Sequence, residues 1–163
     1  MSKVVVGVMG PGKGASEKTL ASAFELGRLI AVEGWVLLSG GRDAGVMDAA
    51  CKGAKAAGGL TIGILPGADV RGMSDSVDIA IVTGMGQARN NINVLSSWVV
   101  FACGMGAGTA SEVALAIKAG KRIILVDCSP EGMAFFETLG EENVFVVAQS
   151  SEAIAIAKKL MQT

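Results

Sequence analysis

The residues with the clearest chemical potential lie in a glycine-rich segment, Gly104–Glu112, which follows the apolar run Trp98–Cys103. A strand that turns through glycines into a helix leaves backbone N–H groups unpaired at the start of the helix. Those groups and the helix dipole together bind anions, most often phosphate. A carboxylate at Glu112, three residues into the expected helix, can point at the same ligand. This segment therefore predicts a site for a phosphorylated small molecule.

A second glycine-rich turn, Gly10–Lys13, matches two motifs in part. Counted from Gly7 it gives Gly-x4-Gly-Lys, close to a Walker A loop, but Gly14 stands where that loop needs the Ser or Thr that binds Mg²⁺. The turn also fits a loose Gly-x-Gly-x-x-Ala dinucleotide fingerprint, but the acidic residue expected after the second strand is missing. A P-loop nucleoside triphosphatase is therefore disfavoured. Two interpretations stay open: a phosphate contact, or a turn that only lets strand and helix pack closely.

A third turn, Ser39–Arg42, again places glycines between a buried strand and a helix. Its backbone can cradle an anion, and the Arg42 guanidinium can add charge and forked donors to phosphate. The alternative is an exposed ion pair between Arg42 and Asp43. Taken alone, the residue types favour the ion pair.

A polar cluster at Arg89, Asn90 and Asn93 begins a further helical stretch after Thr83–Gly86. Residues at these spacings can share one helix face. Arginine and asparagine beside a glycine loop suit the recognition of a phosphate and of the edge of a heterocycle. A solvated helix start, in which the Asn side chains cap turns, explains the cluster equally well.

The hydrophobic pattern predicts the strands and helices that position these segments. Short runs rich in Val, Ile and Leu are typical of strands buried on both faces of a parallel sheet. Strands are predicted at Lys3–Met9, Trp35–Ser39, Leu60–Leu65, Asp78–Val82, Trp98–Cys103, Arg122–Asp127 and Asn143–Val147. Helices are predicted at Ser16–Val32, Ala44–Ala57, Gly86–Ser96, Thr109–Ala119 and Ser151–Met161. We expect one α/β domain over residues 1–163: a Rossmann-like, doubly wound, mainly parallel sheet of about seven strands flanked by helices. Ligands then bind at the carboxyl ends of the strands.

Composition narrows the function classes. The chain has 163 residues, a net charge of −1 and a pI of about 5.5, which argue against nucleic-acid binding. No apolar run approaches the roughly 20 residues that span a bilayer, and no signal peptide is expected. Half of the residues are hydrophobic and the mean hydropathy is +0.53, which favours covered sheet faces or association of subunits. The three cysteines lack metal-site spacing and predict reduced thiols in the cytoplasm or a plastid stroma.

The sequence contains no histidine and no tyrosine. Histidine is the usual general base near neutral pH and the commonest metal ligand. Any acid–base chemistry must therefore come from Asp, Glu, Lys or Cys, and we expect no protein-bound metal site.

Three segments together resemble the superfamily of the Lonely Guy cytokinin-activating phosphoribohydrolases, long called lysine decarboxylase-like. They are Ser39–Gly41 with Gly45–Met47, then Arg89 and Asn90, then Gly106–Glu112. The hallmark of those enzymes is Pro-Gly-Gly-x-Gly-Thr-x-x-Glu. This chain keeps its second half as Gly106, Gly108, Thr109 and Glu112, and departs from it at residues 104 and 105, where Gly and Met stand.

Within that superfamily the chain most resembles the molybdenum cofactor carrier proteins of algae and cyanobacteria, from the first strand to about Val126. The resemblance implies a Rossmann-like fold, a homotetramer, and binding of the pyranopterin dithiolene–molybdenum cofactor without turnover, for protection and for transfer to molybdoenzymes. The metal arrives bound to sulfurs of that ligand, so protein histidines are not needed. The implied cofactor-binding residues are Gly10, Pro11, Gly12, Lys13, Ser39, Gly40, Gly41, Arg42, Arg89, Asn90, Met105, Gly106, Ala107, Gly108, Thr109 and Glu112. In this interpretation the Gly104–Thr109 turn holds the phosphate, and Gly10–Lys13 and Ser39–Arg42 add charge and close the crevice. Arg89, Asn90 and Met105 contact the pterin or dithiolene end.

The same resemblance leaves an enzymatic alternative open. Related phosphoribohydrolases use an Arg–Glu pair to cleave a nucleoside 5′-monophosphate into base and ribose 5-phosphate, and the matching positions are Arg89 and Glu112. A carboxylate there can stabilise an oxocarbenium-like state and activate water. The altered residues 104 and 105 count against this activity. The carrier is the preferred interpretation.

Overall fold

The computed structural model describes residues 2–162, whose seven strands form one sheet with every neighbouring pair parallel. The strands are β1 (Val5–Met9), β2 (Val36–Ser39), β3 (Thr61–Leu65), β4 (Ile79–Val82), β5 (Val99–Cys103), β6 (Arg122–Val126) and β7 (Val144–Val147). Their order is β4-β3-β2-β1-β5-β6-β7. The predicted α/β, Rossmann-like sheet is confirmed, and each predicted strand starts and ends within two residues of the observed one.

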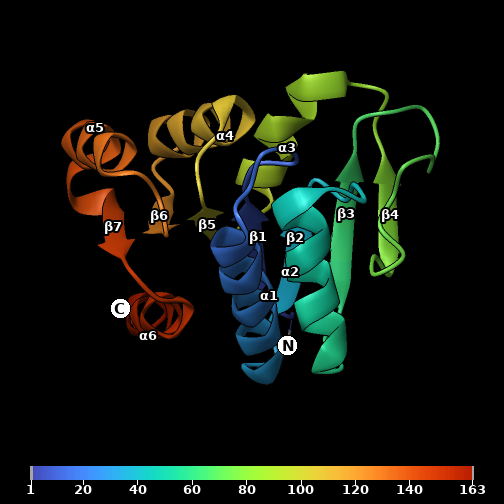
Figure 1. Ribbon diagram of the computed structural model, residues 1–163, viewed down its shortest axis with the longest axis horizontal. Helices are drawn as coiled ribbons and strands as arrows, with labels where there is room; N and C mark the ends of the chain where they lie inside the picture. The colour runs from blue at the N-terminus through green and yellow to red at the C-terminus, as the bar shows by residue number, and fades with distance from the viewer. Residues whose placement is uncertain (1, 163) are drawn as a thin grey trace.

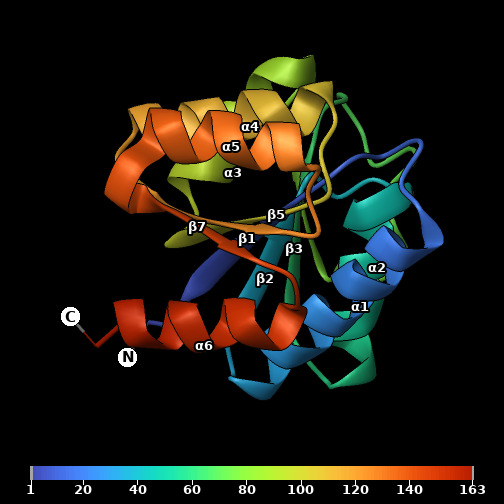
Figure 2. The ribbon, with the colours of Figure 1, turned by 60° about the vertical axis from the view of Figure 1, so that its left-hand side comes forward.

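Helices cover both faces of this sheet. They are α1 (Glu17–Val32), α2 (Gly45–Ala56), α3 (Asn90–Leu95), α4 (Ala107–Lys118), α5 (Pro130–Gly140) and α6 (Ser150–Leu160), with 3-10 turns η1 (Gly86–Arg89) and η2 (Glu141–Asn143). Figure 2 shows α3, α4 and α5 on one face and α1, α2 and α6 on the other. The core is accordingly split: Val6 and Val8 pack with Leu26 of α1, whereas Met9 packs on the side of Val113 of α4. Within residues 2–162, no helix is long and apolar enough to cross a bilayer.

The order of the strands creates one switch point, between β1 and β5. From β1 the chain adds β2, β3 and β4 on one side, and later β5, β6 and β7 on the other (Figure 1). In open parallel sheets, ligands bind outside the carboxyl ends of the strands at such a point. The loops that leave β1 and β5 there contain Gly10–Lys13 and Gly104–Gly106. The topology therefore brings together two glycine-rich turns that are far apart in the sequence.

One helix, α5, is missing from the predicted elements. Its start carries a recognisable signal, because the Ser129 hydroxyl accepts a hydrogen bond from the Gly132 amide at 3.3 Å and Pro130 occupies the first turn. Parallel strands such as β6 and β7 also need a crossover connection. The helical period is hard to recognise because large apolar residues also lie on the exposed side, where Phe135 and Leu139 are 62% and 51% exposed.

Two further boundaries differ from prediction at the carboxyl edge. The stretch expected as one helix, Gly86–Ser96, divides into η1 and the short α3. Helix α4 begins at Ala107, two residues before the predicted start, with Gly106 in extended conformation as its N-cap. Gly108 and Thr109 therefore belong to the first turn of α4, and Glu112 lies in the second turn.

Candidate anion-binding site

A cavity of about 410 Å³ opens at the carboxyl edge of the sheet, beside the switch point. Four segments wall it: the β1–α1 loop, the β2–α2 loop with the start of α2, η1 with the first residue of α3, and the start of α4. The lining residues are Gly10, Pro11, Gly12, Lys13, Arg42, Met47, Gln87, Arg89, Asn90, Gly106, Ala107, Gly108, Thr109 and Glu112. Twelve of the sixteen residues predicted for the site thus lie around one cavity.

Close contact between the loops explains the need for glycine at two positions. A Cβ atom on Gly10 would lie 2.5 Å from the Cys103 carbonyl oxygen, which is too close for any larger residue. Gly104 has a φ of +70°, in the left-handed region, and a Cβ there would lie 2.7 Å from Cγ2 of Thr19. These two residues let the β1–α1 loop lie directly against the β5–α4 turn. The packing interpretation therefore accounts for Gly10, while Gly12 and Lys13 still face the cavity.

The start of α4 presents the features of an anion site. The amides of Ala107, Gly108 and Thr109 belong to the first turn, where N–H groups have no partner within the helix. A Cβ on Gly108 would meet no atom within 4 Å, so the backbone there is open to a ligand. The Thr109 hydroxyl is buried and has no hydrogen-bond partner in the structure. A buried hydroxyl without a partner is costly, and a ligand atom in the cavity would satisfy it.

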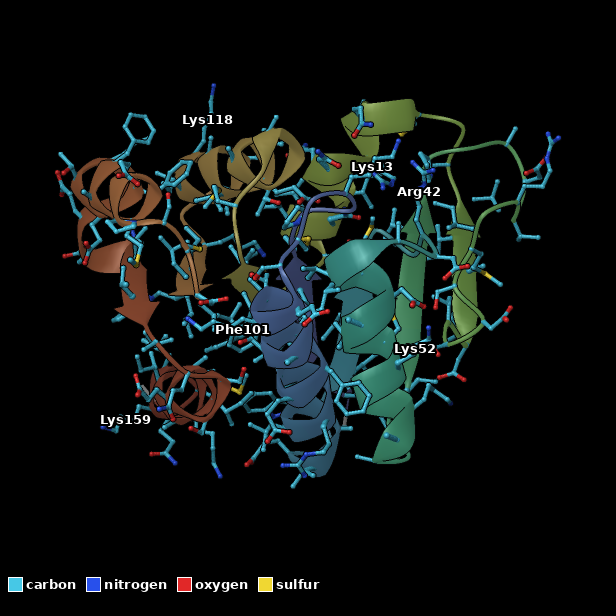
Figure 3. The ribbon with its side chains drawn as sticks, viewed as in Figure 1. Lys13, Arg42, Lys52, Phe101, Lys118 and Lys159 are labelled. Atoms are coloured by element: carbon cyan, nitrogen blue, oxygen red, sulfur yellow. The ribbon has the colours of Figure 1, made fainter. Side chains whose placement is uncertain are left out.

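Three cations surround the same space. Lys13 and Arg42 are exposed and lie at the same end of the sheet, as Figure 3 shows. Arg89 is 5% exposed; its guanidinium donates to Asn90 Oδ1 at 2.9 Å and to the Gly40 carbonyl at 3.5 Å, while its Nε has no partner. Burial lowers the pKa of Arg89 from its ordinary value, Glu112 opposes this effect, and Arg42 adds to it. The cavity is therefore lined by three positive charges, and the Nε–H group of Arg89 is left without an acceptor.

Both polar groups of the Asn90 side chain form hydrogen bonds within the protein. Its Oδ1 accepts from Arg89, and its Nδ2 donates to the Ser111 hydroxyl at 2.9 Å. Ser111 in turn donates to the Gly108 carbonyl at 2.7 Å. This chain of hydrogen bonds joins η1 to the first turn of α4. Asn90 thus orients Arg89 toward the cavity rather than offering free polar atoms to a ligand.

The one carboxylate among the lining residues, Glu112, is 7% exposed. Its Oε1 accepts a hydrogen bond from Asn93 Nδ2 at 2.9 Å. Burial raises the pKa of Glu112 to about 7, although the Asn93 hydrogen bond and the charge of Arg89 act in the opposite direction. Burial therefore favours the neutral, protonated form of this carboxyl.

Four predicted site residues do not line this cavity within the described chain: Ser39, Gly40, Gly41 and Met105. Ser39 is buried, and its hydroxyl accepts from the Gly41 amide at 3.1 Å, which shapes the turn before Arg42. Met105 is half-buried and packs against the core cluster that contains Val113 and Phe136. Its contact with the pterin or dithiolene end stays a prediction.

Conversely, Gln87 and Ser111 were not singled out from the sequence. Gln87 is an exposed residue of η1 and lines the cavity, and Ser111 joins Asn90 to α4. No motif marks either residue, because Gln87 lines the cavity through the tertiary position of η1 and Ser111 acts through its hydrogen bond with Asn90 of α3.

The arrangement suits an elongated anionic ligand. A helix start and three cations favour a phosphate group, and the unpartnered Thr109 hydroxyl and Arg89 Nε provide donors of defined position. A volume of about 410 Å³ also leaves room for a ring system beside the phosphate.

Comparison with known proteins agrees with this geometry. The chain is similar to the molybdenum cofactor binding protein from the phototrophic bacterium Rippkaea orientalis, with a TM-score of 0.97 and 53% identity over 99% of each chain. It is similar to the molybdenum cofactor carrier protein of Chlamydomonas reinhardtii, with a TM-score of 0.94 and 54% identity over 99% of this chain and 100% of the other. An uncharacterized protein of Archaeoglobus fulgidus is 43% identical over 92% of this chain and 99% of its own length.

The family assignment follows from a match over nearly the whole chain. The model of the SLOG cluster4 family covers residues 3–155, which include all seven strands and every residue that lines the cavity. The chain belongs to the SLOG cluster4 family.

Proposed function

We propose that this protein binds the molybdenum cofactor, shields it and passes it to acceptor enzymes without chemical turnover. The observation that carries the proposal is the similarity, at 53–54% identity over 99% of the chain, to a molybdenum cofactor binding protein and a carrier protein. The cavity supports it independently, because its helix start and cations suit a phosphate and its volume suits an attached ring system.

In this proposal different residues of the cavity bind different parts of the cofactor. The first turn of α4, with the Thr109 hydroxyl, is the phosphate-binding loop, and Lys13 adds charge from the facing loop. Arg89, Gln87 and Met47 border the rest of the cavity and are the contacts for the pterin and dithiolene part. The molybdenum stays on the sulfurs of the ligand.

Replacing Thr109 by Val tests the phosphate assignment. Because the hydroxyl is buried without a partner, Thr109→Val should leave the free protein as stable or raise its stability by up to about 1 kcal/mol. It should weaken cofactor binding by about tenfold, since a hydrogen bond to a charged group is lost. Co-elution of molybdenum with the protein on oxygen-free gel filtration, together with urea unfolding, measures both effects. Thr109→Ser keeps the hydroxyl and serves as the control; equal retention by the Val and wild-type proteins would contradict the assignment.

The same preparations distinguish carrier from phosphoribohydrolase. Arg89 and Glu112 line one cavity, as the enzymatic alternative requires, but Arg89 hydrogen-bonds Asn90 and Glu112 hydrogen-bonds Asn93. We expect no free base when the protein is incubated with AMP or a prenylated AMP. If the wild type releases free base and Glu112→Ala does not, the carrier proposal is contradicted and the protein is a phosphoribohydrolase.

We further propose that the protein is a homo-oligomer, and a tetramer as the resemblance implies. The edge strand β4 supports association, because Ile79, Ile81 and Val82 are each 43–44% exposed, and Met85 beyond it is 49% exposed. Ile79 and Ile81 lie on one face of the strand. Ile79→Lys with Ile81→Lys should lower the mass measured by light scattering. Phe135→Lys, on α5 at the other end of the sheet, is the matched control, and a smaller mass only in that variant would place the interface on α5.

The proposal also covers the cellular compartment of the protein and the enzymes that would receive the cofactor from it. The cysteines Cys51, Cys103 and Cys128 are all free thiols, which fits the reducing environment of the cytoplasm. The acceptors would be molybdoenzymes that lack their cofactor.

A further inference from the structure

The floor of the cavity holds an incomplete hydrogen-bond arrangement between α3 and α4. Asn93 is fully buried and Glu112 is 7% exposed. Asn93 Nδ2 donates to Glu112 Oε1 at 2.9 Å, but Asn93 Oδ1 is buried and has no partner. Rotating the amide by 180° would set its oxygen against the carboxylate oxygen, so that two acceptors meet, and would leave the NH2 group without a partner. With an ionised Glu112, which has acceptors only, the pair cannot be completed in either orientation.

A protonated Glu112 completes it. One oxygen of a carboxylic acid accepts from an amide N–H while its O–H donates to the amide oxygen, so that two hydrogen bonds close a ring. We infer that Glu112 is held as a neutral carboxylic acid in a cyclic pair with the Asn93 side chain. The protonated carboxyl then serves as a positioning group that joins α3 to α4 beneath the anion-binding turn, and in that form it cannot act as a catalytic base.

The surroundings of Glu112 fit a neutral acid. The charged groups that face the cavity with it are Lys13, Arg42 and Arg89, and the hydrogen bonds of Arg89 go to Asn90 and to the Gly40 carbonyl rather than to this carboxyl. Burial is the largest influence on Glu112 and raises its pKa to about 7. Satisfying an unpartnered buried amide oxygen adds to the stability of the protonated form.

A consequence for ligand binding rests on the proposed function. Glu112 follows Thr109 by one turn of α4, so an ionised carboxylate lies close to where a phosphate would bind. Repulsion between two anions at short range disfavours that state. Binding of an anion should therefore be coupled to proton uptake by Glu112 once the pH exceeds the pKa of about 7.

The location of the proton can be tested without any ligand. Infrared difference spectra of the free protein between about pH 6 and about pH 9 should show loss of a protonated-carboxyl C=O band. The band should be absent in Glu112→Gln and unchanged in Glu137→Gln, an exposed matched control on α5. A missing band in the wild type, or one that persists in Glu112→Gln, would overturn the inference. Should Glu112→Gln fail to fold, Glu112→Asp, whose shorter side chain cannot close the same ring, should shift the band.

Thermal stability gives a second readout with a defined sign. The pKa of Glu112 is raised from 4.5 to about 7 on folding, so the folded state binds more protons between these values. Wild-type stability should therefore fall relative to Glu112→Gln as the pH rises from about 4.5 to about 7, and the difference should then level off. A difference that does not change with pH would contradict the inference.

Sulfate is the probe for the coupling, because its charge does not change in this range. Above about pH 7 the wild-type Kd for sulfate should rise about tenfold per pH unit, whereas that of Glu112→Gln should stay flat. Parallel pH profiles for the two proteins would refute the coupling. If neither protein binds sulfate at any pH, the anion-binding turn of the proposed function fails, and the infrared experiment still decides the state of Glu112.

Discussion

Gly108→Asp is expected to abolish binding of an anionic ligand, by about 100-fold or more, without destabilising the protein. The fold should tolerate the side chain because a Cβ at this position meets no atom within 4 Å. An aspartate in the first turn of α4 also complements the helix dipole, so stability should stay equal or rise by up to about 1 kcal/mol. The new carboxylate, however, occupies the space where the ligand phosphate would accept its hydrogen bonds, and like charges at short range cost several kcal/mol.

Gly108→Asn provides the matched control for this experiment. Asn has nearly the same shape as Asp but no charge, so it separates crowding from repulsion. Retention of cofactor on gel filtration and urea unfolding should be measured on both variants. If Gly108→Asp retains cofactor as well as the wild type does, the phosphate does not bind at the start of α4. If both variants lose binding equally, the effect is steric.

Gly27→Ala should destabilise the protein by about 3 kcal/mol, at the upper end of the usual cost of overpacking. Gly27 of α1 faces α2, where a Cβ would overlap the Ala50 carbonyl and lie 2.8 Å from its carbon. Gly53 of α2 faces α1 in the same way, 2.7 Å from the carbonyl carbon of Phe24. Both obstacles are backbone atoms, so relief requires the two helices to move apart.

The displacement matters for the site because α1 and α2 begin next to two of the cavity walls. We expect Gly27→Ala to lower the melting temperature by roughly 6–12 °C and to weaken cofactor retention as well. Gly67→Ala is the control: its Cβ would lie 3.7 Å from the Asp69 carbonyl oxygen, an ordinary contact, and stability should change by less than about 0.5 kcal/mol. Equal unfolding curves for the two variants would show that α1 and α2 separate at little cost.

Much of the fold could be predicted because its signals are local. Continuous apolar runs such as Val99–Cys103 identify strands buried on both faces, and all seven were found. Helix α5 was missed because exposed Phe135 and Leu139 hide its period, even though Ser129 and Pro130 mark its start. The start of α4 was placed two residues late, since glycine-rich sequence does not distinguish a helix cap from a first turn.

The candidate site was harder to predict, because a motif names residues but not the directions of their side chains. Asn90 was expected to contact the ligand, and the structure shows both of its polar groups bonded to Arg89 and Ser111. Met105 replaces a motif glycine, and its half-buried side chain packs against the core cluster outside the cavity lining. The pairing of Glu112 with Asn93 joins two helices whose approach no local pattern specifies.

The sequence by itself determined the order of the elements and the glycine-rich turns at the ends of β1, β2 and β5, which predict an anion site. These properties follow from residues near one another in the chain. Tertiary structure alone decided which side chains share the cavity and which are used within the protein. The physical reason is that β5 lies beside β1, so hydrogen bonds and burial at the switch point join residues from opposite halves of the chain. Those contacts give Glu112 a buried position beside Asn93, and they leave the Thr109 hydroxyl and Arg89 Nε beside the cavity without hydrogen-bond partners.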